Sequence, residues 1–271
     1  MPKRSSRHVI YDQLKRQHIR ILLMIEVHNL HKSFGTKKQQ VKALDGLSFK
    51  ANDGEITGIL GPNGAGKTTC LRTLYGLLSA DQGYATIDGI QVADEPLKAR
   101  AQLGIFPDKF GLYERLTAYE QIDYFASLHG MQGKQKHQAI EQVMQDLGMS
   151  ELSQRRTAGF SQGQRMKVTL AQALVHQPKN FVLDEPTRGL DVMSTRILRN
   201  HLAKFKDKGH CILFSSHVMQ EVAALCDRVI IVANGKLAAQ GTPQQLCDLA
   251  NESNLEEAFV KLIGSDEGVA A

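Results

Sequence analysis

The feature that most constrains this chain is a glycine-rich loop placed between an apolar strand and a helical stretch. The strand expected at Ile56–Leu60 is followed by Gly61, Pro62, Asn63, Gly64, Ala65, Gly66, Lys67 and Thr68, which fit the Walker A pattern GxxxxGK[ST]. Glycines let backbone N–H groups turn toward phosphate oxygens, and the following helix presents its positive end to an anion. The alternative, a glycine-rich turn that caps an ordinary helix, fits the preceding apolar strand less well. The spacing therefore predicts a nucleotide-binding P-loop.

A P-loop that hydrolyses nucleotide also needs a bound Mg²⁺ and a group that positions water. Lys67 is expected to reach the β- and γ-phosphates, the Thr68 hydroxyl to bind Mg²⁺, and Thr69 to lie near the α-phosphate. Asp184 and Glu185 end a second apolar strand, and an isolated Asp-Glu there is usually only the start of a loop. Together with the P-loop, however, the pair predicts a metal ligand at Asp184 and a general base at Glu185.

The composition is that of an ordinary globular protein. Of 271 residues, 42% are hydrophobic and 23% are charged, which excludes a disordered, collagenous or purely coiled-coil chain. No window approaches 18 consecutive apolar residues, so the sequence predicts no membrane-spanning helix. The four cysteines form no CxxC pair, and we expect reduced thiols rather than disulfides or a zinc site.

The net charge of +5 comes from one end of the chain. Six basic residues and one acid lie within residues 1–23, which accounts for the whole excess and leaves the remainder neutral. We therefore expect a basic N-terminal extension at 1–24, and no binding of nucleic acid by the body of the protein. The extension could be a flexible arm, a weak membrane-surface patch, or sequence upstream of a true start at Met24.

Alternation of strand and helix patterns defines the expected fold class. Short strand-like runs near the start give way to strand–helix repeats from Ile56 onward, which predict an α/β fold with a parallel sheet covered on both faces. The early runs suggest a small antiparallel β subdomain, and the mostly helical stretch at about 97–165 suggests an inserted α-helical subdomain. We expect one ATPase domain at 25–241 and a short helical tail at 242–271.

These elements and their order in the sequence resemble the ATP-binding subunits of ABC transporters. The resemblance implies the fold of that family, which has a RecA-like P-loop NTPase core. The resemblance covers Ile25 to Ile263 and depends on motifs in sequence order. The segment Ser161, Gln162, Gly163 and Gln164 matches the family signature LSGGQ. The resemblance implies that Ser161 and the Gly163 backbone contact the γ-phosphate held by a partner subunit's P-loop, and a helix N-terminus with a Ser cap suits that task.

Three further residues take roles from the same resemblance. Asp191 matches the loop that crosses the dimer interface, and His217 matches the switch histidine that senses the γ-phosphate. Phe34 matches the aromatic residue that stacks on adenine, although a core phenylalanine at a strand end would look the same in sequence. The implied cofactors are ATP and Mg²⁺.

Two positions depart from the family pattern. Gln162 stands where the signature has Gly, which a helix's first turn tolerates because no positive φ is needed there. Asp108 stands where the family has a loop glutamine. A carboxylate binds Mg²⁺ more strongly than an amide oxygen but is one methylene shorter. We expect Asp108→Ala to lose hydrolysis rate or coupling and to keep nucleotide binding, whereas unchanged ATPase activity would remove Asp108 from the site.

The non-catalytic segments favour one branch of the family. Asp108, the segment Gly111–Thr117 and the closing helix at Leu255–Phe259 resemble the ABC-2 exporters, and the run 184–194 resembles the Nat-type sodium-efflux group. The resemblance implies a cytoplasmic ATPase subunit, peripheral on the inner face of the cell membrane. It would act as a homodimer and power efflux, here of Na⁺, through a separate integral membrane permease. Substrate choice would belong to that permease.

Two other functions remain open from the sequence. A soluble ABC ATPase that acts on ribosomes or DNA would need no permease, and the basic extension is the only support for it. A regulatory cassette that binds ATP without turnover would be consistent with Asp108, but Lys67, Asp184, Glu185 and His217 argue against it.

Overall fold

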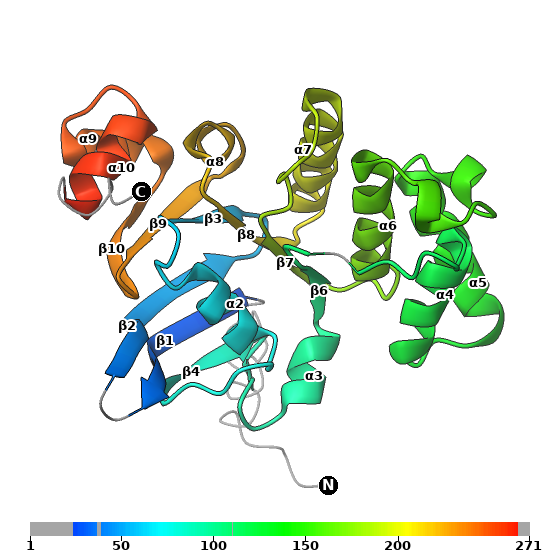
Figure 1. Ribbon diagram of the computed structural model, residues 1–271, viewed down its shortest axis with the longest axis horizontal. Helices are drawn as coiled ribbons and strands as arrows, with labels where there is room; N and C mark the ends of the chain where they lie inside the picture. Colours follow the sequence, from blue (N-terminus) through cyan, green and yellow to red (C-terminus); the bar gives the residue numbers. More distant parts are fainter. Residues whose placement is uncertain (1–23, 37–38, 110, 265–271) are drawn as a thin grey trace, which may run out of the picture.

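The computed structural model describes residues 24–36, 39–109 and 111–264 (Figure 1). The expected basic extension therefore lies outside the described residues apart from Met24, as does the tail beyond residue 264. The strands are β1 (Met24–Thr36), β2 (Gln39–Asn52), β3 (Ile56–Leu60), β4 (Gln82–Ile87), β5 (Ile90–Gln91), β6 (Leu103–Phe106), β7 (Asn180–Asp184), β8 (Cys211–Ser216), β9 (Arg228–Ala233) and β10 (Lys236–Gly241). The α-helices are α2 (Lys67–Leu74), α3 (Pro96–Ala101), α4 (Ala118–Leu128), α5 (Gly133–Asp146), α6 (Gln162–Leu174), α7 (Val192–Asp207), α8 (Met219–Leu225), α9 (Pro243–Ala250) and α10 (Leu255–Ile263).

The described strands form two sheets that lie against each other. The larger sheet has the order β10-β9-β3-β8-β7-β6, in which only β10 runs antiparallel to its neighbour. The smaller sheet, β2-β1-β4-β5, is antiparallel throughout. The α/β architecture with an additional antiparallel sheet, which the sequence predicts, is therefore confirmed. Because β3, β8 and β7 are parallel, their carboxyl ends lie at the same edge of the larger sheet.

The six-stranded sheet is buried on both faces because its strands alternate between two hydrophobic clusters. In β8, Ile212 and Phe214 belong to one cluster, whereas Leu213 between them belongs to the other. The first cluster takes in side chains of α4 to α10, and the second takes in α2 and the antiparallel sheet. Successive side chains of a strand point to opposite faces, so α2 and α6 pack on opposite sides of the sheet.

The stretch expected to be helical, 97–165, contains one strand of the larger sheet. Leu103–Phe106 pairs in parallel with β7 as an edge strand, and helices α4 and α5 follow it (Figure 1, green). Four residues are too few to show a period of two, which explains why the surrounding helical pattern concealed β6. The helical subdomain boundaries stay a prediction.

Helix α2 is shorter than the sequence suggested. The sequence pattern after the P-loop predicts a helix near Lys67–Leu78, but Gly76 adopts a φ of +65° and the helix ends after Leu74. The Leu77 N–H then donates to the Arg72 carbonyl at 3.0 Å, which closes the last turn around the left-handed glycine.

The C-terminal helices α9 and α10 complete the described chain. Thr242 and Gln245 form a reciprocal capping box at the start of α9, and Leu246 and Phe259 join the first hydrophobic cluster. Among the residues that the structure describes, none of the helices is long and apolar enough to cross a bilayer.

Candidate nucleotide-binding site

The loop that joins β3 to α2 leaves the first turn of α2 open to an anion. Gly66 is the N-cap residue with a φ of +104°, it provides no capping side chain, and the first turn has no acidic residue. A Cβ atom at Gly66 would lie 2.3 Å from the Ala43 carbonyl oxygen, so β2 also excludes a larger residue there. Unpaired N–H groups at a helix start favour phosphate.

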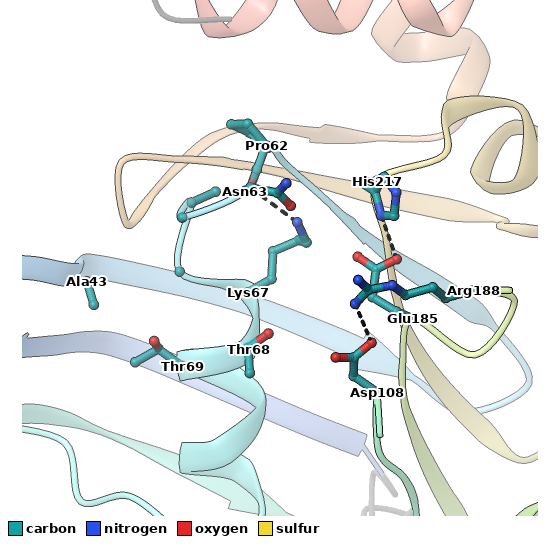
Figure 2. A pocket seen from close by; sticks show the side chains of 13 residues that line it. Ala43, Pro62, Asn63, Lys67, Thr68, Thr69, Asp108, Glu185, Arg188 and His217 are labelled. Atoms are coloured by element: carbon teal, nitrogen blue, oxygen red, sulfur yellow. Dashed lines mark hydrogen bonds and ion pairs between the residues drawn. The ribbon is translucent and has the colours of Figure 1, made fainter. Parts of the chain in front are cut away.

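Lys67 folds back over this loop. Its buried ammonium donates to the Gly61 carbonyl at 2.6 Å and to the Pro62 carbonyl at 3.2 Å (Figure 2). Burial lowers the pKa of Lys67, and the charges of Glu185 and Asp184 oppose that shift. The cation is therefore positioned within the loop by backbone carbonyls before any phosphate contact is needed.

Asp184 is buried at the end of β7, where its carboxylate accepts a hydrogen bond. The Ser215 hydroxyl donates to its Oδ1 at 2.6 Å, and the Thr68 side chain lies near enough to oppose a rise in the pKa of Asp184. Burial raises the pKa of Asp184, and the charge of Asp108 acts in the same direction. A carboxylate next to the Thr68 hydroxyl supplies the oxygen donors that a divalent cation such as Mg²⁺ prefers.

Glu185 turns away from β7 through a left-handed backbone conformation, with a φ of +49°. Its N–H donates to the Ser215 carbonyl at 3.2 Å and to the Ser215 hydroxyl at 3.1 Å. Its Oε2 lies 2.7 Å from Nδ1 of His217. A φ in this region is costly for a residue other than glycine, and such strain is concentrated at functional positions.

Most of the P-loop, together with Glu185 and His217, lines a cavity of about 290 Å³. Figure 2 shows the P-loop side chains on one side and the side chains of Asp108, Glu185, Arg188 and His217 facing them. The structure thus brings together the sequence-predicted residues Pro62, Asn63, Gly64, Ala65, Gly66, Lys67, Thr68, Thr69, Asp108, Glu185 and His217. Asp184 touches this set through Thr68.

Two residues of the cavity wall were not singled out from the sequence. Ala43 is contributed by β2, and Arg188 by the turn after β7. Arg188 Nη1 lies 2.9 Å from Asp108 Oδ1, so the two side chains form an ion pair across the cavity rim. The only sequence signal was the basic residue within the motif that starts at Asp184, and nothing local indicated its partner 80 positions earlier.

The remaining predicted residues lie outside this cavity. Phe34 on β1 is 44% exposed and pairs in the sheet with Val41, two residues from Ala43. Ser161 is the N-cap of α6, where its hydroxyl and the Gln164 side chain form a reciprocal capping box. Since α6 packs on the opposite face of the sheet from α2, this chain's own Ser161 does not line its own P-loop cavity.

Gly163 and Asp191 bring the starts of α6 and α7 together. A Cβ atom at Gly163 would lie 2.4 Å from Oγ of Ser194, so a larger residue would force the Ser194 side chain to move. Asp191 caps α7 by accepting from the Ser194 N–H at 2.8 Å and from its hydroxyl at 3.0 Å. These bonds lower the pKa of Asp191. Asp191 therefore stabilises the start of α7 within one chain, whether or not a second chain is bound.

Comparison with known proteins decides the family. The family model described as "ABC transporter" matches residues 44–188, which is more than half of the chain. The chain belongs to the ATP-binding proteins of ABC transporters. The ABC transporter ATP-binding protein NatA of Bacillus subtilis is 40% identical over 238 residues, which cover 88% of this chain and 97% of NatA.

Solved structures agree with this assignment. The ATP-binding subunit of an ABC transporter superposes with a TM-score of 0.79 and 29% identity, covering 89% of this chain and 100% of that one. A bacterial ABC transporter cassette described as dimeric, MJ0796, shares the fold with a TM-score of 0.73 and 23% identity, covering 80% and 98%. The chain therefore has the ABC ATPase fold, and its family hydrolyses ATP.

Proposed function

We propose that this chain is the ATP-hydrolysing subunit of an ABC export system, bound to the cytoplasmic face of the membrane through a separate permease. The observation that carries the proposal is that the residues expected to form one ATPase site lie in two separate places on the chain. The P-loop, Asp108, Glu185 and His217 line one cavity, whereas the signature segment that begins at Ser161 lies at the start of α6, away from it.

The residues of the cavity fit Mg²⁺-ATP. The open N–H groups of α2 and the ammonium of Lys67 would bind phosphate oxygens, and Gly61 to Thr69 would surround the triphosphate. Thr68 and Asp184 would hold Mg²⁺, with Asp108 as a further oxygen donor. Bound Mg²⁺ would neutralise part of the charge that develops on the phosphates.

Glu185 is the proposed general base. Its carboxylate lies at the cavity wall and accepts from His217 when Nδ1 carries the proton, which leaves the second oxygen for a water molecule. The water proton would move to the carboxylate as the water attacks the γ-phosphorus and the bond from that phosphorus to the β–γ bridging oxygen breaks, which releases ADP and inorganic phosphate. His217 would orient the carboxylate and respond to the γ-phosphate beside it.

The second half of the site would come from another copy of the chain. Ser161 and the N-terminal turn of α6 are solvent-facing, so the positive end of this helix and the Ser161 hydroxyl are accessible to a phosphate group. MJ0796, which shares the fold, is described as dimeric. We propose a head-to-tail homodimer that closes over two ATP molecules and reopens after hydrolysis, with Phe34 beside the adenine.

An apolar groove offers a docking site for the permease. The groove has a volume of about 660 Å³ and lies between β6 and the helices that follow it. Leu97 and Leu128 on its rim are 76% and 64% exposed, and Leu103 and Ile105 of β6 form its floor. Because β6 leads directly to Asp108, a cytoplasmic helix of the permease seated here would be mechanically linked to the ATP site.

Sodium is the proposed cargo, and this proposal depends on the resemblance of the motifs to the Nat-type sodium-efflux group. NatA supports the placement among transport ATPases through its identity over most of both chains. Cargo recognition would belong to the permease, so the same ATPase chemistry would serve another exported compound equally well.

The test is recovery of a partner from detergent-solubilised membranes with a tagged Glu185→Gln chain and Mg²⁺-ATP. We expect one polytopic membrane protein in near-equimolar amount, and lost recovery in Leu128→Glu but not in Leu249→Glu, a matched leucine that is 67% exposed on α9. Recovery of ribosomal proteins or nucleic acid would contradict the proposal. With the partner in hand, slower efflux of ²²Na⁺ from cells lacking the chain would support sodium, and unchanged efflux would exclude it.

A further inference from the structure

The ion pair between Asp108 and Arg188 spans two loops that end neighbouring strands. Asp108 follows β6 and Arg188 follows β7, and their side chains meet at 2.9 Å on the rim of the cavity. Figure 2 shows the pair beside Glu185 and across the cavity from Lys67. Both groups therefore face the space in which the terminal phosphate of ATP would lie.

The charges around this space explain why such a pair is useful. Asp108, Asp184 and Glu185 bring three carboxylates to one side of a site that must accept a polyanion. Lys67 is the cation on the opposite side, and His217 adds charge only when protonated. Since like charges a few ångströms apart repel strongly in a partly buried site, an uncompensated Asp108 would oppose the binding of the γ-phosphate.

We propose that Arg188 is a positioning residue that cancels the charge of Asp108, so that the pair presents an oxygen acceptor without net charge, as a neutral amide would. The inference rests on the proposed nucleotide site and specifies how this chain uses a carboxylate there. The guanidinium holds one carboxylate oxygen, Oδ1, and leaves the other for a metal ion or a water molecule.

Two simpler roles for Arg188 make different predictions. If the pair only ties the two loops together, any variant that breaks it has the same effect, whichever charge is lost. If Arg188 binds the phosphate itself, removal of Asp108 cannot compensate for its loss. Only charge cancellation predicts that removal of both charges restores the nucleotide affinity that is lost when Arg188 alone is removed.

The experiment measures the dissociation constant of a fluorescent, slowly hydrolysed ATP analogue with Mg²⁺, and of the matching ADP analogue, for four proteins. These are the wild type, Arg188→Gln, Asp108→Asn and the double variant. Lys261→Gln breaks a comparable 3.0 Å pair between α10 and Glu252 of the loop that precedes it, and serves as the control. Thermal unfolding without nucleotide establishes that each variant is folded.

We expect Arg188→Gln to weaken binding of the ATP analogue by about fivefold or more, and ADP by less, because the carboxylate faces the terminal phosphate. Asp108→Asn and the double variant are expected to stay within about twofold of the wild type or to bind more tightly. A double variant as weak as Arg188→Gln would overturn the inference. A wild type that binds neither nucleotide would instead overturn the proposed function.

Discussion

At the scale of single residues, the conformation of Glu185 ties the strained backbone to the proposed chemistry. The φ of +49° and the two bonds from its N–H to Ser215 direct the carboxylate into the cavity, where it contacts His217.

Glu185→Gln tests the role of this carboxylate. The amide keeps the size of the side chain but cannot accept a proton, so we expect ATP turnover to fall by at least about 100-fold while the dissociation constant for ATP changes little. Phosphate release and equilibrium binding measure the two quantities. Turnover within tenfold of the wild type would assign proton transfer to another group.

Local residues of the site were predictable, and residues defined by long-range contacts were not. Gly61 to Thr69 lie in one continuous segment whose pattern carries its own mechanism. Arg188 acquires its place only through Asp108, which is 80 positions away and on another strand. A guanidinium in a turn is usually solvated, so its sequence neighbours gave no reason to single it out.

At the scale of secondary-structure elements, the start of α6 has both a structural and a proposed chemical task. Ser161→Ala removes the capping oxygen, which costs about 1 kcal/mol and lowers Tm by about 2–4 °C for a chain of this size. We expect ATP turnover to fall by much more than this loss explains. Thr242→Ala is the control because it breaks the same capping box at α9, remote from the cavity. Equal turnover in the two variants would reduce Ser161 to a helix cap.

Close packing between α6 and α7 gives a second element-scale prediction. Gly163→Ala places a methyl group against Ser194, whose hydroxyl is held by Asp191, and we expect a loss of about 1–3 kcal/mol in the free energy of unfolding. Gly159→Ala, with no atom within 4 Å of the added carbon, should be close to neutral. Urea unfolding of both variants measures the difference. Equal free energies of unfolding for the two variants would show that α6 and α7 can move apart to make room for the methyl group.

The ends of helices and the positions of short strands are the features that sequence patterns predict least well. The helical pattern predicts helices at Thr117–Leu128 and Gln135–Leu147, close to the observed α4 and α5, whereas the four residues of β6 are too few to show a distinctive period. The end of α2 depended on Gly76, which can end a helix or lie within one, and only tertiary packing decides between these. Strand order is likewise set by pairing between distant segments, which no local pattern reports.

At the scale of the whole molecule, His176 links the larger sheet to the helices beyond it. Its Nε2 donates to the Leu103 carbonyl of β6 at 3.0 Å, and its ring stacks on His129 at the end of α4. Burial lowers the pKa of His176 to about 4, and the charge of His129 acts in the same direction. The fold therefore requires this imidazole to be neutral.

This requirement predicts a loss of stability in mild acid. His176 binds a proton near pH 6.5 in the unfolded chain but only near pH 4 in the folded chain. The contribution of neutral His176 to the free energy of unfolding is therefore fully present above pH 6.5 and is lost as the pH falls toward 4. We expect a decrease of about 1–2 kcal/mol between pH 7 and pH 5, smaller in His176→Gln. Urea unfolding at the two pH values measures it, and an identical decrease in both proteins would contradict the assignment.

The proposed division of the ATPase site between two copies of the chain makes dimerisation the central claim. The most direct measurement is the molar mass of Glu185→Gln by light scattering during size-exclusion chromatography, with and without Mg²⁺-ATP. We predict twice the mass of one chain with Mg²⁺-ATP, one chain without it, and one chain with Mg²⁺-ATP when Ser161→Arg is added at the exposed start of α6. A protein that binds ATP and stays monomeric would contradict the composite site.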